Sequence, residues 1–170
     1  MYTHDIGTAS PGESVAYCES IYRLLHKDCS LHVNMETRIA SLLHEQPLTI
    51  LTQQQFTRNE WLLLLVLLHN YPYYAPHEML LASITCLSVE ECRRRLQDAR
   101  RLGTEELRRE LKPVYRAMCH IRAKLSKLHP DLKVSLVRDI GYLLTAPLQG
   151  DHAVSQRNIQ NEESDSLNEW

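Results

Sequence analysis

The chain has 170 residues, of which 44% are hydrophobic and 24% charged, and its formal net charge is −2. This length and composition suit one soluble domain with appendages. The longest uninterrupted apolar run, Trp61–Leu68, is far shorter than the roughly 20 residues of a membrane-spanning helix. The N-terminus also lacks the basic and then apolar regions of a signal peptide. We therefore expect a cytoplasmic protein that does not bind membranes.

The side chains that usually carry enzyme chemistry do not form a known pattern. The five cysteines are an odd set with no C-x-x-C spacing, so reduced thiols are the simplest interpretation. The nine histidines include no H-E-x-x-H motif and no Cys/His pair at metal-ligand spacing. For His69 and His77, which flank a turn rich in tyrosine and proline, we expect helix-end and surface roles instead of metal ligation. The sequence also contains no P-loop, no G-x-G-x-x-G and no G-x-S-x-G motif. It therefore predicts no metal, no cofactor and no enzymatic activity.

The charges are unevenly distributed along the chain. Residues 1–30 carry 2 basic and 4 acidic side chains, and residues 149–170 carry 1 basic and 5 acidic. Residues 85–138 carry 14 basic and 7 acidic side chains, which gives this block a net charge of +7. Such a block can present a positive face to phosphates, although a solvated helix surface explains it about as well.

The N-terminal third predicts one helix and three short strands. Apolar residues recur at helical spacing over Glu13–His26, which indicates an amphipathic helix. Its stripe packs by default on its own domain, and a homodimer contact is the alternative, since dimers double the half-site contacts of DNA readers. We expect strands at Leu31–Val33, Arg38–Leu42 and Leu48–Leu51, although Ile39–His44 fits a helix almost as well.

Helix-start signals recur in the middle of the chain. Thr57 and Glu60 form a capping box that opens a helix ending near His69. Pro76 suits the first turn of a further helix over His77–Thr85.

A second capping box opens the next helix. Ser88 and Glu91 precede a helix over Val89–Arg101, which Gly103 ends. Thr104 is a plainer cap candidate for the helix after that.

The last elements are a helix and a hairpin. The helix is expected over Pro113–Leu128, where the proline marks either the first turn or a kink in a longer helix from Glu105. Strands at Lys133–Val137 and Tyr142–Thr145 form a terminal hairpin. Residues 148–170 are rich in Gln, Asn, Ser, Glu and Asp and should be a disordered acidic tail.

Four segments carry a recognisable pattern in this order. They read Phe56-Thr57-x-x-Glu60-Trp61-x-Leu63-Leu64, Tyr73-Tyr74-Ala75-Pro76-His77-Glu78-Met79-Leu80-Leu81, Val114-x-x-x-Met118-x-x-Ile121-Arg122-x-x-Leu125 and Val137-Arg138-x-Ile140-Gly141-Tyr142-x-Leu144. Together they resemble the first helix, the second-helix entry, the recognition helix and the wing of the OmpR/PhoB-type winged-helix effector domain of bacterial response regulators. The resemblance covers roughly residues 31–147.

The resemblance implies an α+β fold, a winged helix-turn-helix with short antiparallel strands, a C-terminal β-hairpin wing and an extra helical insertion. The insertion spans about residues 86–112, because the connection between the second and third helices is much longer here than in the family. Residues 1–30 become an N-terminal extension, too short for the family's receiver domain of about 100 residues. The implied function is sequence-specific binding of double-stranded DNA by a stand-alone transcriptional regulator.

The candidate DNA-binding residues lie on the last helix and the wing. Helical spacing places Val114, Met118, Ile121 and Leu125 on one face of that helix and leaves a basic face opposite, which would enter the major groove. We assign DNA contacts to Arg116, Cys119, His120, Arg122, Lys127 and Arg138. An amphipathic helix with a merely solvated basic face is the other interpretation of the same spacing.

Several positions depart from the family pattern or invite a second interpretation. Cys119 and His120 stand where the family commonly has arginine, and Asp139 replaces a usual glycine in the wing. Arg93-Arg94-Arg95 spread over about 200° of a helix, so pairing with Glu90, Glu91 and Asp98 is favoured over a common phosphate contact. The alternative function is a winged-helix protein interaction module without its own DNA operator, in which the insertion at 86–112 binds RNA polymerase or another protein.

Overall fold

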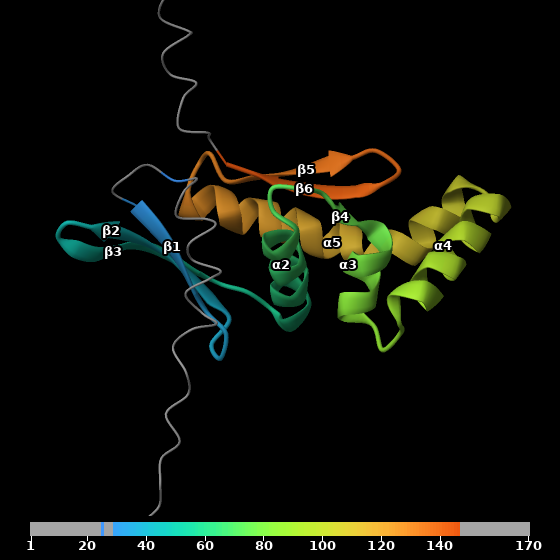
Figure 1. The fold of residues 1–170 in the computed structure, drawn as a ribbon, viewed down its shortest axis with the longest axis horizontal. Coiled ribbons are helices and arrows are strands. Elements are labelled where there is room, and N and C mark those ends of the chain that lie inside the picture. Colours follow the sequence, from blue (N-terminus) through green and yellow to red (C-terminus); the bar gives the residue numbers. More distant parts are fainter. Residues whose placement is uncertain (1–24, 26–28, 147–170) are drawn as a thin grey trace, which may run out of the picture.

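The computed structural model describes residue 25 and residues 29–146, which form an α+β fold with four helices and two small antiparallel sheets. Figure 1 shows one sheet at one end of the molecule and α4 at the other, with α5 running between them. The elements in chain order are β1 (Cys29–Asn34), β2 (Ile39–Glu45), β3 (Leu48–Gln55), α2 (Arg58–Asn70), β4 (Ala75–Pro76), α3 (His77–Ile84), α4 (Val89–Leu102), α5 (Thr104–Leu128), β5 (Lys133–Val137) and β6 (Gly141–Thr145). The predicted helix Glu13–His26, apart from Leu25, and the tail at 148–170 lie outside the described residues.

The first sheet has the order β1-β2-β3 and confirms the three predicted strands. The segment Ile39–His44, which fitted a helix almost as well, is a strand because β2 pairs with neighbours on both sides. On β1, the buried residues Leu31 and Val33 alternate with exposed ones, as in a half-buried sheet, whereas Ala40, Ser41 and Leu42 of β2 are all buried.

The predicted helix starts are largely confirmed. The Thr57 hydroxyl accepts from the Glu60 backbone N–H, while the Glu60 carboxylate accepts from the Thr57 N–H, so the capping box is complete. Ser88 caps α4 by accepting from the Glu91 N–H, and Gly103 ends α4 with a positive φ of 128°.

The last helix differs from the prediction at its start. α5 runs without interruption from Thr104 to Leu128 with Pro113 inside it, so the longer of the two expected helices is correct. Thr104 does not cap it, because Gly103 occupies the N-cap position and gives no side-chain hydrogen bond. The predicted end of the insertion at residue 112 therefore falls within a continuous helix.

Burial explains why the helix continues through the proline. An internal proline costs a helix about 3 kcal/mol, since one hydrogen bond is lost and the ring crowds the preceding turn. Leu111 and Val114, on either side of Pro113, are fully buried, so both halves of α5 pack on one core.

The second sheet has the order β4-β6-β5, and its β5–β6 hairpin confirms the predicted terminal hairpin. Gly141 is required by close approach, because a Cβ at this position would overlap the carbonyl oxygen of Ala75 on β4. Asp139 takes a positive φ of 61° in the turn. The hairpin is thus joined to the start of α3, where the His77 N–H also donates to the Ile140 carbonyl.

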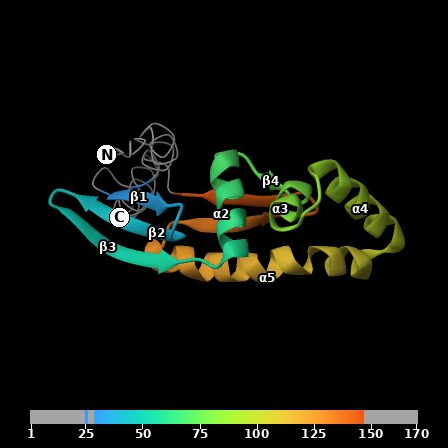
Figure 2. The same cartoon turned by 90° about the horizontal axis from the view of Figure 1, so that it is seen from below.

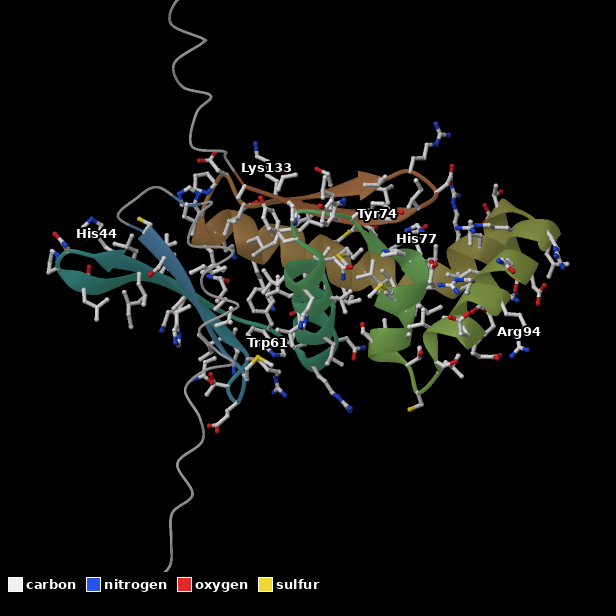
Figure 3. All side chains as sticks on the ribbon, in the orientation of Figure 1. His44, Trp61, Tyr74, His77, Arg94 and Lys133 are labelled. Carbon is white, nitrogen blue, oxygen red and sulfur yellow. The ribbon has the colours of Figure 1, made fainter. Side chains whose placement is uncertain are left out.

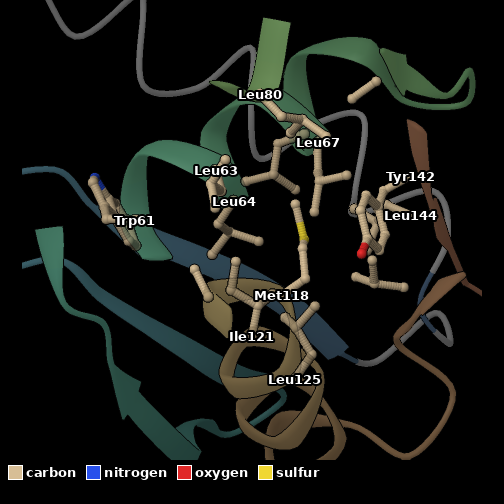
Figure 4. Packing of buried hydrophobic residues seen from close by; sticks show 14 of the residues in the cluster. Trp61, Leu63, Leu64, Leu67, Leu80, Met118, Ile121, Leu125, Tyr142 and Leu144 are labelled. Carbon is tan, nitrogen blue, oxygen red and sulfur yellow. The ribbon is translucent and has the colours of Figure 1, made fainter. Parts of the chain in front are cut away.

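The core lies where α2, α3, α5 and the hairpin meet. Figure 4 shows its side chains, with Met118 of α5 between leucines of α2 and the hairpin residues Tyr142 and Leu144. The run Trp61–Leu68 contributes most of the α2 part, as its apolar character predicted. The packing of α5 on this core determines which face of the helix is exposed to solvent.

Candidate nucleic-acid interface

The two faces of α5 are arranged as the helical spacing predicted. Val114, Met118, Ile121 and Leu125 are buried. Arg116, Cys119, His120, Ala123 and Lys127 are exposed on the opposite side, which we call the exposed face of α5. Figure 2 shows α5 along one edge of the molecule, with none of the other described elements beneath it.

A buried carboxylate anchors one part of this face. Glu60 of α2 is only 3% exposed, and its Oε1 lies 3.1 Å from Nδ1 of His120. Its Oε2 accepts from Nζ of Lys124 at 2.5 Å and from the Thr57 backbone N–H at 2.8 Å. Lys124 also lies over the ring of Phe56, 5.2 Å from its centroid. The arrangement ties the start of α2 to the middle of α5.

The environment of Glu60 keeps its carboxylate charged. Burial by itself raises the pKa of Glu60, but hydrogen bonds from Lys124 and the Thr57 N–H, the positive charge of Lys124 and the contact with His120 outweigh it. The net result is a pKa of Glu60 below its ordinary value. At neutral pH the carboxylate is therefore ionised and can only accept hydrogen bonds.

The sequence assigned Glu60 to helix capping alone and did not select Lys124. The signal available was weak, because a capping-box glutamate lies near the helix start whatever it contacts elsewhere. Its contact with α5 spans 60 residues of sequence and exists only because the two helices pack together.

Arg122 occupies a different position from the other candidate residues. Its Nε donates to the Val134 carbonyl of β5 at 2.7 Å, and its guanidinium lies 5.4 Å from the ring centroid of Tyr142. Burial raises the pKa of Tyr142 to about 12, although the charge of Arg122 opposes this shift. Arg122 is thus half-buried between α5 and the hairpin, and these contacts direct it toward the hairpin.

The turn of the hairpin carries the remaining candidate. Arg138 is exposed there, and the neighbouring Leu136 and Ile140 are also exposed. Arg100 of α4 donates to the backbone carbonyl of Asp139 at 2.9 Å, so α4 supports the turn from one side.

The arginines of α4 are mostly paired with carboxylates. Arg93 pairs with Glu90 at 2.7 Å, and Arg94 pairs with Glu91, as the sequence predicted. Arg95 instead pairs with Glu110 of α5 at 2.9 Å, while Asp98 pairs with Arg101.

This pairing of arginines with nearby glutamates continues into the first turns of α5. Arg108 pairs with Glu105, and Arg109 pairs with Glu106. We call the stretch from Arg93 to Arg109 the paired segment, and the stretch from Lys112 to Arg138 the open segment. Five exposed cations of the open segment have no acidic partner within ion-pair distance among residues 29–146, namely Lys112, Arg116, Lys127, Lys133 and Arg138. In Figure 3 Arg94 and Lys133 project from well-separated parts of the molecule.

His77 departs from its predicted surface role. It begins α3, at a helix end as expected, but it is only 2% exposed and lies edge-on to Tyr115 and Tyr142. Burial lowers the pKa of His77, the charge of Arg100 lowers it further, and Glu78 and Asp139 oppose the shift. The surface prediction was wrong because rings from α5 and β6, distant in sequence, close over the imidazole.

The described residues contain no cluster of three His, Cys, Asp or Glu side chains that could hold a metal ion. None of the helices in the same part of the chain is long and apolar enough to cross a bilayer. Comparisons with protein-family models, with curated proteins and with solved structures find no match to this chain.

Proposed function

We propose that the fold is a winged helix and that the chain binds double-stranded DNA, with α5 as recognition helix and the β5–β6 hairpin as wing. The observation that carries the proposal is the exposed face of α5, whose cations Arg116 and Lys127 have no acidic partner in the described part of the chain. An uncovered α-helix fits the width of a DNA major groove, and unneutralised cations on it gain affinity by releasing counterions.

The side chains of this face suit different parts of a duplex. Arg116 can donate hydrogen bonds to guanine O6 and N7 or to a phosphate, and Lys127 can donate to a phosphate. Cys119 is small and allows close approach of the helix, while His120 is polar and exposed. Arg138, in the hairpin turn, is positioned for a neighbouring phosphate or the adjacent minor groove.

The four motifs that resemble OmpR/PhoB-type domains support the same proposal and extend it to transcriptional regulation. The described elements follow the order of these motifs: three strands come first, α2, α3 and α5 follow with α4 inserted before α5, and the β5–β6 hairpin comes last. Arg122, which we first assigned to DNA, is better placed as a support for the hairpin, since its Nε and its guanidinium face are both engaged there.

The paired segment favours a second candidate function, a protein interaction module. Neutralised arginines attract phosphates weakly, whereas a helix with mostly paired charges and an exposed apolar residue suits a protein surface. Leu102, at the end of α4, is 77% exposed. RNA polymerase or another protein would then bind at α4, with or without DNA on α5.

The test is fluorescence anisotropy of a labelled random-sequence duplex between about 50 and 200 mM salt, where the affinity of a DNA-binding protein falls steeply. We expect micromolar binding by the wild-type chain at the lowest salt. Arg116→Ala/Lys127→Ala should weaken it by roughly 100-fold and reduce the salt slope by about 2, since each phosphate contact contributes about 0.9.

The matched control is Arg94→Ala/Arg101→Ala, which removes the same formal charge from the paired segment. Binding by this variant should stay within about twofold of wild type, because its arginines are already neutralised. Absence of wild-type binding at 50 mM salt overturns the DNA proposal. Equal losses in the two double variants would mean that net charge, and not the exposed face of α5, determines affinity.

A further inference from the structure

We infer that His120 reads a base edge carrying an amino group, adenine N6 or cytosine N4, and that Glu60 is the positioning residue that makes it a hydrogen-bond acceptor. This inference rests on the proposed function and specifies which bases the exposed face of α5 prefers. It is carried by the contact of His120 Nδ1 with a buried carboxylate, 3.1 Å away.

The first step is the position of the proton on the imidazole. An ionised carboxylate can only accept, so Nδ1 of His120 must be the donor in its contact with Glu60. A neutral imidazole carries one N–H, and its other nitrogen then bears a lone pair. The contact therefore fixes Nε2 as an acceptor.

The second step is the direction in which that acceptor points. Nε2 lies on the side of the ring away from Nδ1, and the side chain of His120 is 69% exposed. Glu60 itself is held by Lys124 and the Thr57 N–H, so its carboxylate has little freedom to follow the imidazole elsewhere. A histidine oriented by a carboxylate behind it presents its free nitrogen in a defined direction.

The third step is the chemistry of the major groove. Adenine N6 and cytosine N4 present amino donors there, whereas guanine O6 and N7 and thymine O4 are acceptors. A fixed acceptor on His120 favours the first pair and is repelled by the second. This preference is opposite to that of an arginine, which donates only.

Lys124 completes the arrangement. On a DNA-binding helix a lysine usually contacts phosphate, but here its ammonium group is engaged by Glu60 and lies over Phe56. Arg116 and Lys124, one turn to either side of His120, and Glu60 of α2 are the charged groups around the imidazole.

The first test needs no DNA. Long-range ¹H–¹⁵N spectra of protein labelled on histidine nitrogen report the tautomer of each ring, and His120→Asn identifies the signal of His120 by its loss. At pH 8 we expect a protonated Nδ1 and an unprotonated Nε2. Glu60→Gln should return His120 to a mixture of tautomers. A wild-type ring protonated at Nε2 overturns the inference whatever the protein binds.

The second test selects binding sites from a random duplex library at pH 8 with wild type, His120→Ala and Glu60→Gln. We expect one position of the selected site to favour adenine or cytosine by about tenfold, a size typical of one base contact. His120→Ala should lose that preference while keeping the others, and Glu60→Gln should weaken it. His32→Ala, which removes an exposed histidine from β1, should change nothing.

The outcomes separate this inference from the function on which it rests. If wild type selects no sequence and binds no duplex, the DNA proposal fails. If His120→Ala selects the same site as wild type, DNA binding stands and the role of His120 is wrong. Because His120 is exposed, its truncation tests the role even if Glu60→Gln lowers stability.

Discussion

The paired and open segments belong to one basic block of sequence, yet their cations contact different partners. In the paired segment, arginines and glutamates alternate at helical spacing, and nearly every guanidinium meets a carboxylate three residues away or on the neighbouring helix. The open segment contains one acidic residue, Asp131, and five of its cations are exposed to solvent without an acidic partner among the described residues. A count of basic residues, seven in each segment, gives both segments the same importance, whereas the ion pairs leave mainly the cations of the open segment available to a polyanion.

Two other cations of the open segment bind groups of the fold itself and are not free in solvent. Arg122 binds the hairpin, and Lys124 binds Glu60, so each is used within the fold. The open segment therefore combines residues that hold the exposed face in place with residues that remain free to contact a ligand. Variants in both segments test which cations stabilise the fold and which remain free to bind a ligand.

Arg122→Ala should have the largest effect on stability. The substitution removes a charged hydrogen bond to a backbone carbonyl and leaves the face of Tyr142 uncovered, at a cost of about 2 kcal/mol. Arg94→Ala, in an exposed pair, should cost no more than about 0.5 kcal/mol. Urea unfolding of the two variants measures the difference. If both variants lose the same free energy of unfolding, Arg122 does not stabilise the hairpin and is again a candidate for DNA contact.

Glu60→Gln should destabilise the protein by about 1.5 kcal/mol at pH 7, because a charged hydrogen-bond acceptor is replaced by a neutral one. The pKa of Glu60 lies below its ordinary value in the folded state, so its stabilisation is complete above the ordinary pKa of about 4.3 and is lost as the pH falls through the folded value. The stability difference between wild type and variant should therefore shrink in acid. Thermal unfolding at pH 7, 5 and 3 measures it, and a difference that is constant over this range contradicts the assignment.

Arg138→Ala should weaken duplex binding by about threefold and reduce the salt slope by about 0.9, the contribution of one phosphate. The base preferences of the selected site should not change, because phosphate and backbone contacts carry no direct sequence information. Anisotropy and site selection measure the two effects, with Arg101→Ala as the paired-segment control. A changed base preference would show that the hairpin turn reads sequence.

Glu91→Gln/Glu105→Gln should have the smallest effect. The double substitution releases Arg94 and Arg108 from their carboxylates and raises the charge of the paired segment. If this segment lies away from DNA, affinity at 0.1 M salt should rise by less than about twofold, since charges beyond the Debye length of about 10 Å are screened. A tenfold rise in affinity would place α4 against the duplex and break the distinction between the two segments.

The sequence alone determined the elements whose causes are local. The capping residues Thr57 and Ser88, the stop at Gly103 and the apolar spacing of α5 predicted helix starts, a helix end and a buried face that the structure confirms. Each depends on interactions within a few residues, such as an orphan backbone N–H at a helix end or the 3.6-residue period of a helix. The coarse α+β class, which the resemblance implied, agrees with the helices and the two antiparallel sheets of the described residues.

Tertiary structure alone decided what depends on residues far apart in the chain. It buried His77 between two tyrosines, directed Arg122 to the hairpin and joined Glu60 to His120 and Lys124. The helix α5 also continues through Pro113, because burial of the residues on both sides outweighs the cost of a proline inside a helix. Local propensity determines where a helix can form, but only packing determines which of its polar side chains find partners and which remain free.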